Sequence, residues 1–284
     1  MPIIPTSFAK HIGEKLSKNF SVVWPKKNRD GKIKFPDGES YAALPKLDKK
    51  ERYTVIHTGM PNPNDGLMEL KIILGILKNN QIPNVEVCFT YFPYGMQDAV
   101  FDPGEQNVAE GLIKEFFEYF KVKRIHVIDA HFSSKKWINQ YPVYNIPAFE
   151  PMKREVLKKY PDILFLVPDL GCQKRTRLQG TEKKRLNSYL VEIKDNTGLK
   201  KLVNNRAIGV VDDIIETGGT MERFALECQK LECKKLVAVI THGVLKKGID
   251  RIKKNYQDLF LTNSISRQES NIDITPSLIK YLKL

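Results

Sequence analysis

One stretch decides the fold, Val210-Val211-Asp212-Asp213-Ile214-Ile215-Glu216-Thr217-Gly218-Gly219-Thr220, and a helical pattern over residues 221–231 follows it directly. An apolar run ends in two carboxylates, and a turn with two glycines leads into the predicted helix. Because glycine has no Cβ, backbone N–H groups can close on a phosphate there, and the positive end of the helix favours the same charge. The pattern predicts a strand, an acidic sheet edge and an anion-binding loop.

The side chains of this stretch suit a sugar phosphate. Thr217 and Thr220 add hydroxyl donors beside Gly218 and Gly219. Three acids can accept hydrogen bonds from sugar hydroxyls or bind a metal ion that bridges sugar and phosphate; they are Asp212, Asp213 and Glu216. The alternative is an ordinary strand-to-helix turn. Carboxylates directly after a buried strand are costly without a partner, which favours the binding loop.

Length and composition indicate a globular protein. The 284 residues are enough for two domains of usual size, and 42% hydrophobic with 28% charged residues exclude bulk disorder. The formal charge of +13 would attract polyanions. Since the basic residues are scattered along the chain and form no long basic tail, we predict no dedicated nucleic-acid partner.

The four cysteines and the N-terminus bear on the compartment. No Cys-x-x-Cys pair occurs, so neither a zinc site nor a disulfide framework is indicated, and a reducing compartment is the simpler inference. The N-terminus has no cationic segment leading into an apolar core, and no apolar run reaches membrane-spanning length. We therefore expect a cytoplasmic protein without a membrane partner.

Strand and helix patterns alternate along the whole chain, which predicts βαβ units and an α/β fold with parallel sheets. The predicted strands are residues 20–24, 53–57, 85–91, 124–128, 163–167, 189–193, 207–211, 236–240 and 259–262. Two similar sets of elements meet near residue 147. We expect an N-terminal domain over residues 1–147 and a C-terminal domain over residues 148–284, whose last helix can pack back on the N-terminal domain.

Two segments of the N-terminal half could hold a nucleotide. Phe35-Pro36-Asp37-Gly38-Glu39 is a turn when taken alone, but it also offers an aromatic face for a purine and two carboxylates to accept from its amino group. The segment 92–98, which includes Gln97 and Asp98, follows a predicted strand. Ligands bind at such strand ends in open α/β sheets.

Further candidates for metal and phosphate chemistry follow other strands. His131 comes just after a strand and beside Asp129, where an imidazole can ligate a metal or meet a phosphate. Asp169 is either a turn former or an acid that faces a ligand. The basic segment 172–188, with Lys183 and Arg185, is either a solvated charge run or a lid that closes over phosphates.

Taken together, these landmarks resemble the ribose-phosphate pyrophosphokinase family over nearly the entire chain. The matching pieces, in order, are residues 35–39, 64–70, 92–94 with 97–98, 129–131, 168–171, 182–185, 212–220 and 241–243. Residues 212–220 are also similar to the phosphoribosyl pyrophosphate loop of type I phosphoribosyltransferases. In both families Asp usually stands where this chain has Glu216.

The resemblance implies two phosphoribosyltransferase-type domains, each a mainly parallel sheet flanked by helices, with catalysis between them. It implies transfer of the β,γ-diphosphoryl group of ATP to the 1-hydroxyl of ribose 5-phosphate, with Mg²⁺ as cofactor and a homo-oligomer, dimer or hexamer, as the assembly. The implied residues are Phe35, Asp37, Glu39, Gln97 and Asp98 for ATP; Asp212, Asp213, Glu216, Thr217, Gly218, Gly219 and Thr220 for ribose 5-phosphate; His131 and Asp169 for the metal; and Lys183, Arg185 and His131 for catalysis.

Three departures from the family pattern keep other functions open. Met96 stands where the family commonly has an Arg, the span from Asp169 to Lys183 is shorter, and the chain ends soon after its last predicted helix. One alternative is a non-catalytic homologue that binds phosphoribosyl ligands and regulates a partner. Another is a phosphoribosyltransferase that uses the product.

Overall fold

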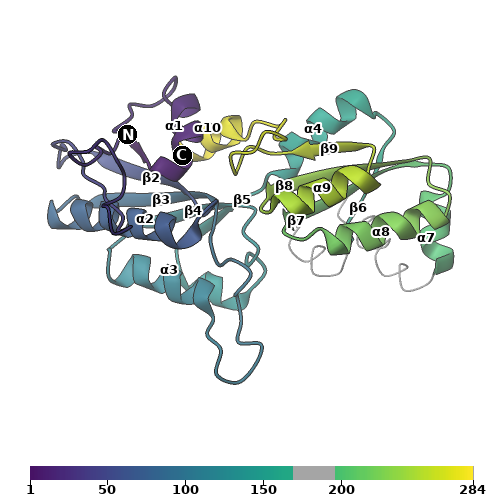
Figure 1. The fold of residues 1–284 in the computed structure, drawn as a ribbon, viewed down its shortest axis with the longest axis horizontal. Helices are drawn as coiled ribbons and strands as arrows, with labels where there is room; N and C mark the ends of the chain where they lie inside the picture. The colour runs from purple at the N-terminus through teal and green to yellow at the C-terminus, as the bar shows by residue number, and fades with distance from the viewer. Residues whose placement is uncertain (169–195, 284) are drawn as a thin grey trace. The chain divides into compact units, whose positions relative to one another are not determined.

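The computed structural model describes residues 1–168 and 196–283 (Figure 1). The chain divides into two compact units. The first comprises Met1–Ile146 with Thr275–Leu284, and the second comprises Pro147–Ile274. The C-terminal helix α10 (Thr275–Leu282) therefore belongs to the first unit, where it contacts helix α1 (Lys10–Leu16) and strand β5 (Val143–Ile146).

The first unit is built on a five-stranded sheet in the order β1-β2-β3-β4-β5, and every neighbouring pair is parallel. The remaining strands are β1 (Ile3–Pro5), β2 (Arg52–Thr58), β3 (Asn84–Tyr91) and β4 (Arg124–Ile128). The helices are η1 (Ser7–Ala9), α2 (Pro63–Asn79), α3 (Val108–Glu118) and η2 (Lys136–Gln140). Figure 1 shows α2 and α3 on one face of this sheet and α1 with α10 on the other.

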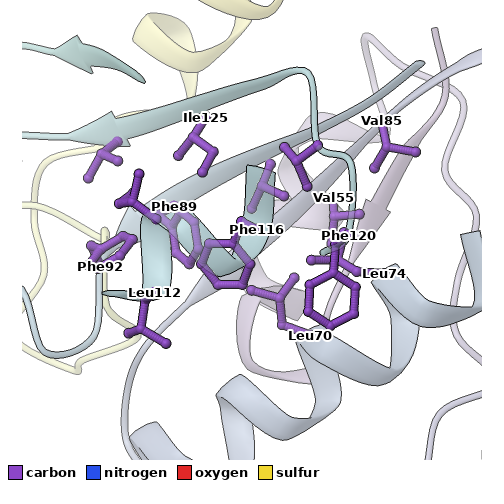
Figure 2. Close-up of a cluster of buried hydrophobic side chains, with 14 of the residues drawn as sticks. Val55, Leu70, Leu74, Val85, Phe89, Phe92, Leu112, Phe116, Phe120 and Ile125 are labelled. Carbon is purple, nitrogen blue, oxygen red and sulfur yellow. The ribbon is translucent and has the colours of Figure 1, made fainter. Parts of the chain in front are cut away.

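Alternate strand residues form the core beneath α2 and α3. Val55, Val87 and Phe89 point to this face because successive side chains of a strand lie on opposite sides of a sheet. Phe89 and Phe116 of α3 pack with their ring centroids 5.7 Å apart, and Figure 2 shows the surrounding cluster of aliphatic and aromatic side chains. The residues of opposite parity, such as Ile56 and Cys88, are fully buried as well. The strands are therefore apolar on both faces, as parallel sheets require.

The second unit has a four-stranded parallel sheet in the order β6-β7-β8-β9. Its strands are β6 (Leu164–Leu166), β7 (Ala207–Ile215), β8 (Lys235–Gly243) and β9 (Asp258–Leu261). Its helices are α4 (Phe149–Lys159), α7 (Asn196–Val203), α8 (Gly219–Lys230) and α9 (Lys246–Asn255). One apolar core joins α7, α8 and α9 to the sheet through residues such as Leu202, Phe224 and Ile252.

The fold class predicted from the sequence is confirmed, since both sheets are parallel and flanked by helices. Among the helices within residues 1–168 and 196–283, none has the length and hydropathy that a membrane crossing needs. The predicted strand over residues 189–193 and the basic segment 172–188 lie outside the described residues.

Several predicted boundaries were wrong. Residues 20–24 form a single bridge, from Val22 to Ile3, and no strand, because the backbone hydrogen bonds of Ser21 and Val23 to β1 both go to Ile3. Strand β7 continues past Val211 to Ile215, since its pairing with β8 runs on through both aspartates. Two strands, β1 and β5, were missed because each is short and contains a residue type that is depleted in strands, Pro5 in β1 and Asn145 in β5.

Candidate functional site

Strand β7 and helix α8 position the glycine turn of the second unit. Gly218 is the N-cap of α8 and takes the left-handed conformation, with φ 75° and ψ 7°, which costs glycine less than any other residue. The helix begins at Gly219, so Thr217 precedes the N-cap and Thr220 is the second helical residue. Backbone N–H groups in the first turn of a helix have no partner within the helix. The predicted anion-binding geometry is therefore compatible with the fold at this turn.

Helix α9 packs closely against this turn. A Cβ added to Gly248, in the first turn of α9, would lie 2.2 Å from the carbonyl oxygen of Glu216. The guanidinium of Arg251, one turn further along, lies 3.5 Å from the position that a Cβ would take on Gly219. Because β7 and β8 are neighbouring parallel strands, the segments that follow them meet at one edge of the sheet. Arg251 thus brings a positive charge to the edge that carries the glycine turn.

The two aspartates of the stretch lie inside strand β7 and are buried, with 7% of Asp212 and 5% of Asp213 exposed. The Asp213 backbone N–H donates a hydrogen bond of 3.0 Å to Asp212 Oδ1. Glu216, one residue beyond the strand, is exposed. The three acids therefore differ in setting, with two held in the sheet and one at the surface of the turn.

Asp212 also affects a nearby tyrosine. Burial raises the pKa of Tyr256, and its electrostatic interactions with Cys228 and Asp212 raise this pKa further. The Tyr256 hydroxyl donates a hydrogen bond of 2.8 Å to the carbonyl oxygen of Met221 in α8. Tyr256 therefore acts as a neutral hydrogen-bond donor that ties the start of α8 to the end of α9.

In the first unit, the segments that follow β3 and β4 meet. Asp98 is buried, and its Oδ1 lies 3.0 Å from the Nζ of Lys135. The Trp137 indole N–H donates to the Asp98 carbonyl oxygen over 3.1 Å. Lys135 and Trp137 follow His131, which lies just past the end of β4 and is half-buried. The loop with Gln97 and Asp98 is thereby joined to the segment that begins at His131.

The start of helix α2 connects a second pair of segments. Asp65 forms an ion pair of 2.5 Å with Lys34, the residue before Phe35. Its neighbour Asn64 accepts a hydrogen bond from the hydroxyl of Tyr94, which belongs to the segment 92–98. The N-cap of α2 is Asn62 and Pro63 is its first helical residue, so Asn64 and Asp65 belong to the first turn. Residues 64 and 65 tie the Phe35 turn and the 92–98 segment to one helix end.

The Phe35 turn offers its polar and aromatic groups to solvent. Phe35 is 44% exposed and meets the Tyr41 ring edge-on at 5.4 Å. Gly38 has a φ of 96°, and the Glu39 backbone N–H donates to Asp37 Oδ1 over 3.1 Å. Asp37 and Glu39 are both exposed. The Phe35 turn and the 92–98 segment both contact the start of α2, through Lys34 and Tyr94.

Of the four remaining predicted site residues, the structure describes Gln97 alone. Asp169, Lys183 and Arg185 lie outside the described residues. Gln97 is exposed, and its carbonyl accepts from the Ala109 N–H at the start of α3. Within residues 1–168 and 196–283, no three side chains among His, Cys, Asp and Glu come together as a metal site.

Sequence reasoning missed Arg251, Gly248 and Lys135. Each belongs to an element that follows the strand next to a predicted site, and none stands in a motif of its own. The signal that was available is the parallel order of the strands, which places the segment after β8 beside the segment after β7. A search of every strand-end segment for cations would have found Arg251 and Lys135.

Comparisons with known proteins address the family. A model of the N-terminal domain of ribose phosphate pyrophosphokinase matches residues 5–119. The ribose-phosphate pyrophosphokinase of Pyrococcus abyssi is 29% identical over 96% of this chain and 95% of its own. That of Thermococcus kodakarensis is 28% identical over 87% of this chain and 89% of its own. The chain is similar to these ribose-phosphate pyrophosphokinases along most of its length.

The fold agrees with this relationship. The crystal structure of phosphoribosylpyrophosphate synthetase from Mycobacterium smegmatis superposes with a TM-score of 0.77, covering 99% of this chain and 97% of that one. The two sequences are 17% identical, so this likeness concerns the fold alone. Together with the enzymes from the two archaea, it confirms the resemblance to the ribose-phosphate pyrophosphokinase family that the motifs predicted.

Proposed function

We propose that this chain is a ribose-phosphate diphosphokinase, which transfers the β,γ-diphosphoryl group of ATP to the 1-hydroxyl of ribose 5-phosphate and yields phosphoribosyl pyrophosphate and AMP. The observation that carries the proposal is the likeness to the Pyrococcus abyssi enzyme over 96% of this chain. A simple phosphoribosyltransferase would leave the match of residues 5–119 to a pyrophosphokinase domain unexplained.

The turn between β7 and α8 would bind ribose 5-phosphate. In this proposal the backbone N–H groups at Gly218 and Gly219 and the hydroxyls of Thr217 and Thr220 hold the phosphate, at the positive end of α8. The acids Asp212, Asp213 and Glu216 would accept from the ribose hydroxyls. The support is the left-handed N-cap at Gly218, which opens the helix end to an anion.

Arg251 would add a charge-assisted contact to the same phosphate. Its guanidinium lies beside Gly219, and it also forms an ion pair with Glu222, Nε to Oε2 at 3.5 Å. A guanidinium has five N–H donors in a fixed fork, so one edge can bind a carboxylate while another binds a phosphate. Glu222 would then orient Arg251 toward the turn.

ATP would bind to the first unit, with Phe35 stacked on the purine and Asp37, Glu39 and Gln97 as polar contacts. The exposed Phe35 ring and the two exposed acids support this, because a bound base would cover groups that are otherwise open to water. Asp98 would position the 92–98 segment of this site, because its carboxylate forms an ion pair with Lys135.

In this proposal a Mg²⁺ ion is the cofactor and is shared between the protein and the substrate. His131 and Asp129 both follow strand β4. Mg²⁺ prefers oxygen ligands, keeps several waters and usually binds through one or two carboxylates plus substrate phosphates. His131 and Asp169 would hold it against the ATP phosphates. When bound, Mg²⁺ would neutralise the negative charge of the diphosphoryl group in transfer.

The chain's own residues would then position the reactants. The 1-hydroxyl of ribose 5-phosphate, fixed by Asp212, Asp213 and the turn, attacks the β-phosphorus of ATP, and the bond from that phosphorus to the AMP oxygen breaks. Lys183 and Arg185 would stabilise the charge on the transferred group. No covalent bond to the protein is needed.

The expected assembly is a homo-oligomer, dimer or hexamer, in the cytoplasm. Sedimentation equilibrium of the purified chain would distinguish these two assemblies from a monomer by mass alone.

The direct test is to incubate the purified protein with ATP, Mg²⁺ and ribose 5-phosphate and to separate the nucleotides by anion exchange. We expect AMP and phosphoribosyl pyrophosphate in equal amounts, and no AMP when ribose 5-phosphate is omitted. Lys183→Ala should lower turnover by orders of magnitude with unchanged thermal unfolding. Ribose 5-phosphate binding without any AMP would instead favour the non-catalytic regulator.

A further inference from the structure

A second site of the second unit lies at the opposite end of its sheet. A pocket of about 580 Å³ is lined by residues at the beginnings of β6, β7 and β8, including Tyr160, Asp162, Arg206, Lys234 and Lys235. Strand β7 has nine residues between this pocket and the glycine turn. At roughly 3.3 Å per residue the two are roughly 30 Å apart. The pocket is therefore separate from the proposed ribose 5-phosphate site.

Positive charge predominates in the pocket lining. Four cations, Lys159, Arg206, Lys234 and Lys235, line it with one acid, Asp162. Lys159 is neutralised by an ion pair of 2.8 Å with Asp258. Within the described residues, neither Arg206 nor Lys234 forms an ion pair with a carboxylate. Arg206 and Lys234, both exposed, thus line the pocket without a carboxylate at ion-pair distance among the described residues.

Tyr160 holds part of this charge in place. Its hydroxyl donates a hydrogen bond to Asp258, the same carboxylate that pairs with Lys159. The ammonium of Lys235 lies 5.1 Å from the centroid of the Tyr160 ring, and that of Lys159 lies 5.5 Å from it. Cations at these distances are attracted to the ring face. The aromatic wall therefore orders two lysines at the pocket instead of offering a bare surface for an apolar ligand.

The backbone fixes the other two cations. The Lys234 N–H donates to the carbonyl oxygen of Arg206 over 2.9 Å, and the Asn205 N–H donates to Glu232 over 2.9 Å. These bonds keep residues 204–206 beside residues 232–235, so the backbones of Arg206 and Lys234 are held next to each other just before β7 and β8. Both side chains are exposed and free to turn toward an anion in the pocket.

We propose that this pocket binds a small molecule that carries a diphosphate group. Its volume falls in the range of roughly 300–1,000 Å³ of small-molecule sites, which exceeds what a single ion needs. The Arg206 guanidinium can bind one phosphate through two parallel N–H donors, and the lysine ammoniums can bind the other as point charges. The starts of β7 and β8 bring the backbones of these cations together, and among the described residues Asp258 bonds Lys159 and Tyr160 and also attracts Lys235.

The test uses inorganic diphosphate as the probe and lysine acetylation, followed by peptide mass spectrometry, as the readout on the full chain. We expect diphosphate to slow acetylation of Lys234 and Lys235 at least threefold and to leave the exposed Lys49 and Lys50 of the first unit unchanged. Equal acetylation rates of Lys234 and Lys235 with and without saturating diphosphate would overturn the proposal.

A variant pair gives a second measurement by calorimetry. R206Q/K234Q should lose at least tenfold in affinity for one class of diphosphate site, whereas K49Q/K50Q, which removes the same charge elsewhere, should bind as the unaltered protein does. The double variant T217A/T220A identifies diphosphate binding at the glycine turn, because it should weaken binding there and leave the pocket unchanged. If the turn variant abolishes all binding and R206Q/K234Q abolishes none, the pocket is not a diphosphate site.

Discussion

The Lys135 ammonium lies 3.0 Å from Asp98 Oδ1, and only 4% of Asp98 is exposed. The sequence assigned Asp98 to a nucleotide, but its carboxylate is occupied by a cation and its carbonyl oxygen by the Trp137 indole. A buried carboxylate that already has its counter-charge contributes mainly by holding its neighbours. Asp98 therefore fixes the end of the 92–98 segment against the residues that follow His131.

Removing the ion pair between Lys135 and Asp98 should lower the free energy of unfolding, with a smaller effect on turnover. Asp98→Asn keeps the shape of the side chain but loses the charge that compensates Lys135, and the free energy of unfolding should fall by about 1–3 kcal/mol. Urea denaturation measures it. Lys136→Gln, at the exposed neighbour of Lys135, is the matched control and should change nothing. An Asp98→Asn protein as stable as the unaltered one would assign Asp98 to ligand binding alone.

A methyl group on Gly248 should push α9 away from the glycine turn. The added Cβ would lie 2.2 Å from the Glu216 carbonyl oxygen and 2.8 Å from Ile215, so backbone must move. We expect Gly248→Ala to lower the free energy of unfolding by about 1–3 kcal/mol and to weaken ribose 5-phosphate binding.

Gly75→Ala is the control for that change. Gly75 lies in α2, and a Cβ there meets nothing within 4 Å. Alanine is favoured over glycine inside a helix by roughly 0.5–1 kcal/mol, so this variant should be as stable as the unaltered protein or more so. If both variants unfold at the same urea concentration, the contact between α9 and the turn is unimportant.

The sequence predicted the parts of the fold that depend on long apolar runs and on turn chemistry. The parallel sheets follow from alternating strands and helices, and the left-handed Gly218 follows from the two glycines at a strand-to-helix turn. The edge strands β1 and β5 were missed because Pro5 and Asn145, of residue types depleted in strands, interrupt their short apolar runs. Strand β7 was predicted too short because aspartates usually end strands, whereas here the ladder with β8 buries both.

The candidate site was predictable only in part, because motifs name the residues that contact a ligand and leave out those that hold them. Lys135 and Arg251 stand in segments of mixed charge, and only the pairing of neighbouring strands brings each one to its partner. Distances between residues far apart in sequence follow from this tertiary arrangement. No local pattern around Arg251 encodes its approach to Gly219.

Arg251 should be needed for ribose 5-phosphate and not for ATP. Arg251→Gln keeps much of the side-chain length but removes the charge beside Gly219, and the KM for ribose 5-phosphate should rise at least tenfold while the KM for ATP stays unchanged. Lys254→Gln, at an exposed lysine of the same helix, controls for net charge. Equal effects on both KM values would place Arg251 in a general structural role.

His57 should make the first unit sensitive to acid. The ring is fully buried, its Nδ1 lies 3.0 Å from Thr6 Oγ1, and its Nε2 has no hydrogen-bond partner within the described residues. Burial lowers its pKa from 6.5 to about 3. Between these two pH values the unfolded chain binds a proton that the folded chain does not, so the free energy of unfolding falls as the pH falls.

The size of this effect follows from the linkage relation. From pH 7 to pH 5, His57 should remove about 2 kcal/mol from the free energy of unfolding, since each pH unit below 6.5 costs up to about 1.4 kcal/mol. Urea denaturation at both pH values, on the unaltered protein and on His57→Gln, separates this contribution from that of the carboxylates. His57→Gln should be less stable than the unaltered protein at pH 7. Between pH 7 and pH 5 its free energy of unfolding should fall by about 2 kcal/mol less than that of the unaltered protein. Parallel losses in the two proteins would mean that His57 takes up its proton without unfolding.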